Sequence, residues 1–467
     1  MSQPNILMIV ADDMGYGDFG IFNDGLSQTP HLDALAGEAQ LLTQHYAGSC
    51  VCAPSRAALL TGRYPHRTGS IDTREARGTD RLGLWETTLA ERLAAKGYAT
   101  GLIGKWHLGE LDQRYLPQNR GFEEVCAFRG GWQDYWDWWL DYGDGWFRRS
   151  DGSYLTDTLS DEACAFLRRH RDEPFFLYLA YNCPHTPLQA PEEDIASFRG
   201  QEAISDAVAT LYGMIRRMDR GIGHVLETLD WLGLAEDTIV LFTSDNGPQF
   251  GSEIGRIERF NGDRARSIGF AGHKGNIYEG GIRVPMIARW PAGLESGRCD
   301  ETVHFCDWTP TLLSAAGVEM QQQPPADGAN LLPLLRGEPA DLPDQRFWQW
   351  NRYQPVGHCN AAMRDGDWKL VRPPMPECFK TTPEDHTDDH ELRDRPGLLA
   401  NVTDRTPPER DVSNPPPSQL FNIADDPAEA HDLAEEEPER AARMQRRLAA
   451  WFEEVEAERL SHGAGPG

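Results

Sequence analysis

The chain has 467 residues, 40% of them hydrophobic, which is enough for one large domain and a smaller second one. Lys and Arg number 45 against 73 Asp and Glu, so the formal net charge is -28. This charge disfavours nucleic acids and anionic membranes as partners. It also argues against densely charged anionic polymers, unless a local basic pocket overrides the long-range field.

Nine cysteines are scattered through the chain without a regular framework or a CxxC pair, which is typical of a reduced protein. The N-terminus lacks the basic flank and long apolar core of a signal peptide, and no apolar run has membrane-spanning length. The sequence as written is therefore expected to be cytoplasmic. If a leader preceded it, the protein would be periplasmic or secreted.

Polar residues with catalytic or metal-binding chemistry follow each of four expected strands. These strands and residues are 5–10 with Asp12 and Asp13, 99–103 with Lys105 and His107, 175–181 with His185, and 239–242 with Asp245 and Asn246. Each polar group alone is more often a turn or a solvated residue. In open α/β sheets, however, ligands gather beyond the carboxyl ends of the strands, so the shared position predicts a common site.

Helices are expected between and after these strands, which gives the α/β class. Their predicted ranges are residues 31–44, 86–97, 158–170, 204–232 and 308–316. Residues 248–270 are expected to form a loop over the site, and a Gly-flanked turn with His273 and Lys274 precedes a strand near residues 283–288.

The segment CVCAPSRAALLTGR, residues 50–63, predicts a short helix. Pro54 fits a first helical turn and Gly62 can end the helix. Cys52 would then lie at the helix N-terminus, where backbone N–H groups favour a thiolate or a bound oxyanion, and Arg56 adds positive charge. A buried packing cysteine in a surface helix is the alternative.

Five tryptophans lie within residues 131–147, namely Trp132, Trp136, Trp138, Trp139 and Trp146. Such rings can stack on sugars, or they can form a satellite core or an interface. For substrate binding we single out Trp136 and Trp139, together with the aromatic stretch at residues 347–353.

Pro and Gly are frequent from residue 324 to residue 343, which places a boundary between domains 1–343 and 344–467. The second domain is expected to hold short antiparallel strands and an exposed helix at residues 437–458. Residues 373–417 show no periodicity and are expected to be a long surface loop.

Asp12, Asp13, Asp245 and Asn246 would form an all-oxygen shell, which suits calcium or magnesium better than zinc. The lysines, the histidines and Arg56 would surround this shell with donors for a tetrahedral oxyanion. A sulfate or phosphate ester is the substrate that such a site fits.

The chain resembles the formylglycine-dependent type I sulfatases, which have an alkaline-phosphatase-like fold. CAPSR matches their Cys-x-Pro-x-Arg modification site, and LTGR, DDMGYGD, GKWHLG, PHTP, SDNG and GHKGNIYEGGIRVP match further family blocks in order. The resemblance extends to RDGDWKLVR and LFNIADDPAEAHDLA near the C-terminus. It implies a large, mixed, mostly parallel sheet sandwiched by helices, with a smaller C-terminal α+β domain carrying an antiparallel sheet.

The resemblance also implies a modified nucleophile and a metal ion. A formylglycine-generating enzyme would oxidise Cys52, and one hydroxyl of the hydrated aldehyde would attack sulfur. Asp12, Asp13, Asp245, Asn246 and residue 52 would hold Ca²⁺, with Mg²⁺ or Mn²⁺ as alternatives.

The resemblance assigns the remaining roles as follows. Arg56 would help to activate the nucleophile. Lys105, Lys274 and His185 would hold the sulfate oxygens, with His185 protonating the departing alcohol. His107 would take the proton from the second hydroxyl.

The function expected from the resemblance is hydrolysis of a sulfate ester, of a carbohydrate or an aryl alcohol, to the alcohol and inorganic sulfate. A phosphonate monoester or phosphodiester hydrolase on the same scaffold is the alternative. A glycan-binding protein that uses the tryptophans is a third reading, and a redox role for Cys50 and Cys52 does not fit the usual CxxC spacing. The oligomeric state stays open.

Overall fold

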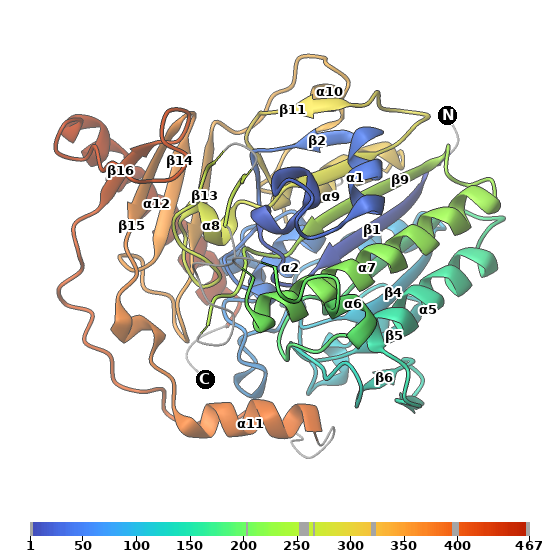
Figure 1. Ribbon diagram of the computed structural model, residues 1–467. Helices are drawn as coiled ribbons and strands as arrows, with labels where there is room; N and C mark the ends of the chain where they lie inside the picture. Colours follow the sequence, from blue (N-terminus) through green and yellow to red (C-terminus); the bar gives the residue numbers. More distant parts are fainter. Residues whose placement is uncertain are drawn as a thin grey trace.

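The computed structural model describes residues 3–201, 204–251, 261–264, 267–318, 324–394 and 401–463. Its centre is a mixed sheet of ten strands with helices against both faces, and a sheet of four strands lies beside it (Figure 1). In spatial order the ten strands are β11 (Gly297–Cys299), β2 (Gln40–Leu42), β10 (Met286–Arg289), β9 (Thr238–Ser244), β1 (Asn5–Ala11), β8 (Phe175–Ala180), β4 (Ala99–Lys105), β5 (Glu124–Phe128), β6 (Trp139–Asp141) and β7 (Phe147–Arg149). The strands from β9 to β5 run parallel to one another.

The central strand β1 is buried on both faces because its apolar run has no polar side. Ile6 and Val10 pack into one layer of the core, and Leu7 and Ile9 pack into the other. The helices on the Leu7 face are α1 (Pro30–Gly37), α5 (Leu155–Arg169), α6 (Glu192–Ile195) and α7 (Asp206–Trp231), and those on the opposite face are α2 (Cys52–Thr61), α4 (Leu89–Ala94) and α9 (Trp308–Ala315). The predicted α/β class and helix-covered sheet are confirmed.

Smaller elements complete the fold. They are the paired strands β3 (His45–Tyr46) and β12 (Val303–His304), and the short helices α3 (Pro65–Thr68), α8 (Glu279–Ile282) and α10 (Leu332–Leu335). The antiparallel sheet comprises β13 (Gln345–Gln349), β14 (Ala361–Asp365), β15 (Trp368–Arg372) and β16 (Gln419–Asn422). These strands match the short C-terminal strands expected from the sequence.

Two predicted helices differ from the structure. The helix expected over residues 31–44 ends at Gly37, and residues 40–42 instead form β2, because they pair with β10 and β11. The helix expected over residues 86–97 is the shorter α4, which begins after Thr88. The Thr88 hydroxyl accepts a hydrogen bond from the Glu91 backbone, so this residue caps the helix.

The final helix, α12 (Pro438–Ser461), is not the exposed helix that we predicted. Met444, Leu448, Trp451 and Val455 recur every three or four residues and are buried. The Trp451 ring stacks on Phe347 of β13 at a centroid distance of 5.1 Å. One face of α12 therefore belongs to the core, and only its other face meets solvent.

The expected surface loop at residues 373–417 contains a helix, α11 (Pro383–Asp394). Charged contacts hold α11 to the 3₁₀ turn η3 (Glu75–Arg77): Arg77 binds Asp385 and Arg74 binds Asp389. Because ion pairs rather than an apolar stripe fix this helix, its sequence has no hydrophobic periodicity to reveal it. Residues 395–400 of this segment, and 252–260 and 265–266 of the expected loop over the site, lie outside the described residues.

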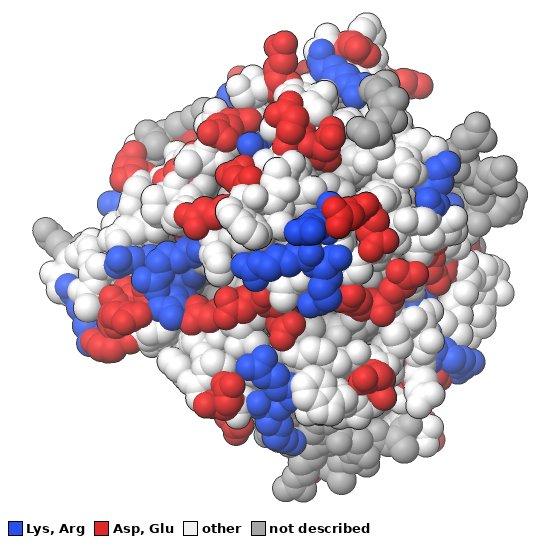
Figure 2. Space-filling model, turned by 90° about the vertical axis from the view of Figure 1, so that its right-hand side faces the viewer, with Lys and Arg blue, Asp and Glu red and all other residues white. Residues whose placement is uncertain are grey.

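Acidic and basic side chains alternate across the face turned toward the viewer in Figure 2. Among the helices that pack on the large sheet, Arg217 of α7 binds Asp157 of α5 and Asp194 of α6. Two acidic neighbours thus neutralise this arginine. Among the helices of the described residues, none combines the length and apolarity that crossing a membrane requires.

Lys369 of β15 joins the small sheet to α8 through buried charges. Its Nζ lies 2.9 Å from Glu279 Oε1 and 2.9 Å from Glu429 Oε1, and all three side chains are fully buried. Burial alone would raise the pKa of Glu279, but Lys369 and Arg283 outweigh it and lower this pKa to about 2. Burial raises the pKa of Glu429 to about 7.

We expect Lys369→Ala to lower the free energy of unfolding by about 3–5 kcal/mol, because it leaves buried carboxylates without their cation. Lys380→Ala is the control, since Lys380 forms a pair with Glu377 but is 52% exposed, and its cost should be at most about 1 kcal/mol. Urea unfolding followed by tryptophan fluorescence measures both. Equal costs for the two variants would contradict the structural role of Lys369.

Candidate active site

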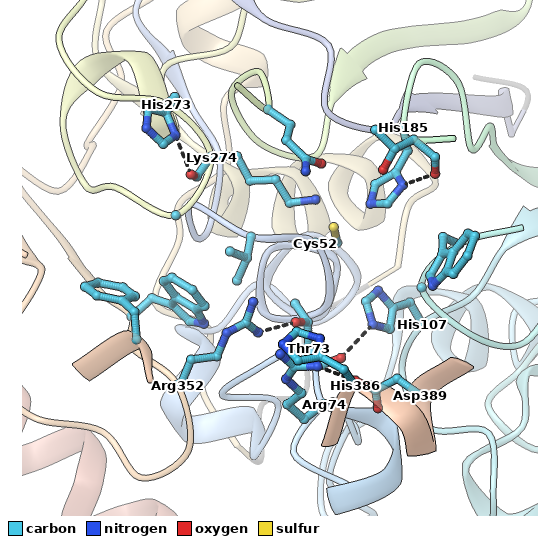
Figure 3. A pocket seen from close by; sticks show the side chains of 18 of the residues that line it. Cys52, Thr73, Arg74, His107, His185, His273, Lys274, Arg352, His386 and Asp389 are labelled. Carbon is cyan, nitrogen blue, oxygen red and sulfur yellow. Dashed lines mark hydrogen bonds and ion pairs between the residues drawn. The ribbon is translucent and has the colours of Figure 1, made fainter. Parts of the chain in front are cut away.

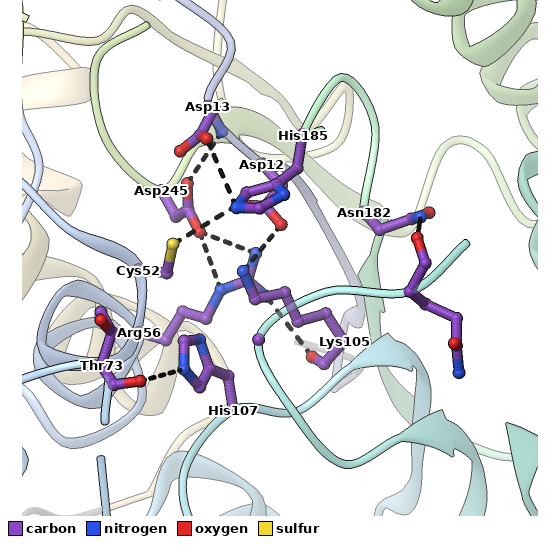
Figure 4. A network of polar contacts seen from close by, with 12 residues as sticks. Asp12, Asp13, Cys52, Arg56, Thr73, Lys105, His107, Asn182, His185 and Asp245 are labelled. Carbon is purple, nitrogen blue, oxygen red and sulfur yellow. Dashed lines mark hydrogen bonds and ion pairs between the residues drawn. The ribbon is translucent and has the colours of Figure 1, made fainter. Parts of the chain in front are cut away.

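The carboxyl ends of β9, β1, β8 and β4 are neighbours in the sheet, and the side chains that follow them meet there (Figure 4). Asp12 and Asp13 follow β1, Lys105 ends β4 with His107 two residues later, His185 follows β8, and Asp245 and Asn246 follow β9. Adjacent parallel strands deliver their ends to the same edge. The structure thus brings together the residues that the sequence placed at four separate strand ends.

Cys52 is the first residue of α2 and lies at the centre of this cluster. Val51 precedes it in an extended conformation, and Gly62 ends the helix with φ 76°. The Cys52 Sγ lies 3.6 Å from Asp12 Oδ1 and is nearly inaccessible to solvent. Burial raises the pKa of the thiol to about 12 despite the nearby lysines, so the unmodified residue is a thiol and not the thiolate that its helix position favours.

Arg56, one turn into α2, fixes the helix to the sheet. Its Nε and Nη2 lie 2.9 Å and 2.8 Å from Asp245 Oδ2, and both side chains are fully buried. Ser55 donates a hydrogen bond to the Asp245 carbonyl at 2.5 Å. The position of Cys52 is therefore set by contacts that Ser55 and Arg56 make one turn further along α2.

Two lysines neutralise the aspartates of β1. Lys105 Nζ lies 2.7 Å from Asp12 Oδ2, and Lys274 Nζ lies 2.7 Å from Asp13 Oδ2. Burial raises the pKa of Asp12 to about 7, although Lys105 opposes the shift. Burial would also raise the pKa of Asp13, but Lys274 and His185 outweigh it and lower this pKa.

The arrangement fits a hard divalent cation. Asp12, Asp13, Cys52 and His185 each offer one ligand atom, and these atoms lie within 4.8 Å of one another. Asn246 donates to Asp13 Oδ1 at 2.8 Å, while its own Oδ1 is buried and accepts no hydrogen bond from the described residues. Such a buried oxygen is a natural metal ligand, because burying it without a partner costs free energy. Asp245, also predicted as a ligand, already binds Arg56.

Two histidines flank Cys52. His185 Nδ1 lies 2.7 Å from the Thr186 carbonyl and donates to it, so Nε2 of the neutral ring faces Asp13 Oδ2 at 3.6 Å with its lone pair. His107 Nε2 lies 3.4 Å from the Thr73 carbonyl and 3.4 Å from Glu75 Oε1. Burial, together with Lys105 and Arg56, holds the pKa of His107 well below its usual value.

The backbone is strained at two of these residues. Asp13 and His107 have left-handed conformations, with φ 64° and φ 56°. Each costs about 1–3 kcal/mol for a residue other than glycine, and such strain is concentrated at functional sites. Both residues turn the chain sharply just after a strand, which directs their side chains back toward Cys52.

A cavity of about 670 Å³ opens above this cluster (Figure 3). Cys52, His107, His185 and Lys274 form its floor and one wall. Arg56 and Lys105 are fully buried beneath it. The cavity is therefore large enough for a sugar-sized group whose ester reaches Cys52.

The structure does not bring Trp136 and Trp139 to this cavity. The Trp136 ring packs on Tyr154 at 5.0 Å, and Trp139, in β6, packs on Phe147 of β7 at 5.7 Å. Trp139 thus packs within the hairpin of β6 and β7 at the sheet edge, and Trp136 packs against the residue that precedes α5. Both contacts correspond to the packing alternative for the tryptophan cluster. Trp132, from the same cluster, does line the cavity.

Several cavity residues were missed by the sequence analysis. They are Thr73, Arg74 and Glu75 near η3, and His386, Asp389 and His390 of α11. Trp350 and Arg352, which also line the cavity, belong to the stretch 347–353 that the sequence analysis singled out. None follows a strand of the large sheet, and α11 has no hydrophobic period. The TREAR segment at residues 73–77 is rich in charge, but charge alone gives no sign of its place beside Cys52.

Residues 4–318 match the family model described as Sulfatase, and residues 271–404 match the one described as N-sulphoglucosamine sulphohydrolase, C-terminal. The chain is 34% identical over 456 residues to the steryl-sulfatase of Mus musculus, which covers 78% of this chain and 69% of that protein. It is 34% identical over 396 residues to arylsulfatase A of Homo sapiens, covering 78% and 74%. The crystal structure of Ps i-CgsB in complex with k-i-k-neocarrahexaose matches with a TM-score of 0.76 and 30% identity, over 96% of this chain and 93% of that chain.

With a family match over most of its length, a helix that begins at a CAPSR cysteine and an oxygen-rich cluster beside it, the chain belongs to the sulfatase family. It is a sulfuric ester hydrolase with the alkaline-phosphatase-like fold, and the resemblance seen in its sequence motifs is confirmed.

The donor set predicts that a divalent cation stabilises the fold. Ca²⁺ at about 100 times its Kd should raise the free energy of unfolding by about 2.7 kcal/mol. Asp13→Asn should abolish this gain, because it removes a charged ligand, while Asp137→Asn, at an exposed loop position, should retain it. Thermal unfolding with and without Ca²⁺ measures the gain, and an equal gain in both variants would place the cation elsewhere.

Proposed function

We propose that this sulfatase removes sulfate from a sulfated carbohydrate, with formylglycine made from Cys52 as its nucleophile. The observation that carries the substrate class is the cavity above Cys52, whose walls combine Trp132 and Trp350 with basic side chains. Aromatic rings bind the apolar faces of sugars, and basic groups bind sulfate. The related Ps i-CgsB has been crystallised with an oligosaccharide, which supports the proposal.

Conversion of Cys52 to formylglycine would supply a hydrated aldehyde, and its hydroxyl would be the nucleophile. The hydrate has a second hydroxyl, which can release the bound sulfate and restore the aldehyde after the alcohol has left. A cysteine side chain has only its thiol, so it could not complete this cycle. The position at the start of α2 also directs backbone N–H groups toward the bound anion.

Lys274 and His185 line the cavity, so we assign them contacts to the sulfate oxygens. Lys105 lies below the cavity floor against Asp12, and we assign it a contribution of positive charge to the bound sulfate. His185 presents Nε2, the nitrogen that does not bind Thr186, to the cavity. Once this atom is protonated, which a bound sulfate anion favours, His185 would donate the proton to the leaving alcohol.

His107 lies across the cavity floor from His185 (Figure 4). Its low pKa keeps the ring neutral, so it can accept the proton of the second hydroxyl of residue 52. That oxygen would then re-form the aldehyde C=O as the C–O bond to the sulfate group breaks and inorganic sulfate leaves. Arg56 would hold Asp245 in place and add positive charge beneath the reacting group.

We assign the resident ion as Ca²⁺, with Mg²⁺ or Mn²⁺ as alternatives, held by Asp12, Asp13, Asp245, Asn246 and residue 52. The ion would act as a Lewis acid that lowers the pKa of the nucleophile and polarises a sulfate oxygen.

The first test combines a peptide mass over residues 50–63 with sulfate release from sugar and aryl sulfates. We expect activity to track conversion of Cys52, and Cys52→Ala to reduce kcat by at least about a thousandfold, since covalent catalysis is lost. Cys50→Ala is the matched control, because Cys50 is buried in an apolar cluster that also contains Ile277 and Trp350. Full conversion with a strong preference for aryl phosphodiesters would instead indicate a phosphodiester or phosphonate monoester hydrolase.

Tryptophan variants test the carbohydrate assignment. Trp132→Ala should raise KM about tenfold for a sugar sulfate but much less for a small aryl sulfate, because a stacked ring contributes about 1–1.5 kcal/mol. Trp136→Ala, 41% exposed and outside the cavity lining, is the control and should leave both KM values unchanged. A larger rise in KM for the sugar sulfate with Trp136→Ala than with Trp132→Ala would support the sequence prediction that Trp136 binds the substrate.

A further inference from the structure

One wall of the cavity carries arginine and histidine side chains beside the carboxyl groups of Glu75 and Asp389, although the chain as a whole is strongly acidic. In Figure 3, Arg352, Arg74 and His386 lie on one side of Cys52, and Lys274 and His185 lie on the other. The second group contacts the sulfate in the proposed function, whereas the first group has no role in it. We therefore consider what the first group binds.

Arg352 is held in a fixed position with one edge free. Its Nη1 lies 2.8 Å from Asp72 Oδ1 and 2.7 Å from Thr73 Oγ1, and its guanidinium lies 5.0 Å from the centre of the Trp350 ring. The Nε and Nη2 groups make no hydrogen bond to the described residues. Arg56 uses its own Nε and Nη2 groups to bind Asp245. The corresponding edge of Arg352 therefore suits a carboxylate or a sulfate.

Helix α11 brings two imidazoles to the same wall through its 3.6-residue period. Asp385 and Asp389 are four residues apart and bind Arg77 and Arg74, which fixes one face of the helix. His386 and His390 are each one residue further along, are exposed and line the cavity. His390 contacts the Trp132 ring edge-on at 5.3 Å.

These groups are close enough to repel one another when charged. Burial, with the positive charges of Arg74 and Arg352, lowers the pKa of His386, while Asp385 opposes the shift and His390 adds to it. An anion bound between Arg352 and the imidazoles would relieve this repulsion. The geometry of the free guanidinium edge indicates where such an anion binds.

We propose that Arg352, His386 and His390 form a second anion-binding subsite, so that the substrate carries another sulfate or a carboxylate next to the ester that is cleaved. This inference rests on the proposed action on sulfated carbohydrates and narrows the substrate to sugars with at least two anionic groups. The net charge of -28 repels such substrates at long range. The basic side chains of the subsite must therefore attract the substrate at short range.

Binding to the Cys52→Ala variant tests the subsite without turnover. The probes are three matched disaccharides that carry one sulfate, two sulfates, or one sulfate and one uronate carboxylate. We expect a second anion to tighten Kd at least tenfold, measured by calorimetry. The disaccharide that gains more identifies the second group as sulfate or carboxylate, and equal affinity for all three would overturn the proposal.

Adding Arg352→Gln should remove most of this gain, since the free guanidinium edge is lost. Arg336→Gln is the matched control, because Arg336 also lies over a tryptophan, Trp290, but outside the cavity lining. The double variant His386→Ala with His390→Ala changes two exposed residues and provides a test even if the Arg352 variant does not fold. It should reduce the gain in affinity from the second anion at least threefold. An undiminished gain in the histidine variant and in a folded Arg352 variant would refute the subsite.

Sulfate release by the converted enzyme separates this inference from the proposed function. Selective binding without sulfate release from any probe would retain the subsite and reject the carbohydrate sulfatase. Sulfate release from the monosulfated probe, without any gain in binding from a second anion, would reject the subsite and retain the carbohydrate sulfatase.

Discussion

The ion pair between Arg56 and Asp245 is the contact on which the rest of the site depends. It joins the helix that carries Cys52 to the end of β9, and neither side chain is exposed. A buried pair of this kind adds little stability over an apolar pair, but loss of one partner is costly because the other charge stays buried. Its main effect is positional, since it sets α2, Cys52 and the neighbouring aspartates relative to one another.

The same principle explains how so many charges are buried in one place. Lys105 opposes Asp12, Lys274 opposes Asp13, and Arg56 opposes Asp245, so each carboxylate has a nearby cation. Because the aspartates and Lys105 come from different strand ends, and Lys274 comes from the turn before α8, the cluster exists only when the sheet is assembled. Two left-handed residues at its edge show that the fold tolerates local strain to hold this geometry.

The sequence was most informative where apolar strands end in polar residues. Continuous apolar runs predicted buried parallel strands. The polar residues that follow the carboxyl ends of these strands predicted which side chains meet beside Cys52. The sequence was least informative for the cavity wall. The α11 histidines come from a segment without hydrophobic period, and their position depends on ion pairs between residues about 300 positions apart, such as Arg77 with Asp385.

The tryptophan cluster also shows what the sequence cannot predict. Its composition allowed both sugar binding and local packing, and in the structure most of its rings pack against other aromatic side chains. Trp138 is fully buried and Trp139 nearly so, while Trp132 reaches the cavity. Which ring faces the cavity depends on the hairpin of β6 and β7, which aromatic density alone does not determine.

The attachment of α11 separates the catalytic floor from the wall that selects the substrate. Contacts between a few arginines and aspartates hold this helix, and the strands that carry Asp12, Lys105 and Asp245 contribute nothing to them. Evolution can therefore replace the segment between β15 and β16 without disturbing the chemistry below it. A single reaction centre could in this way acquire new substrates by exchanging one short helix.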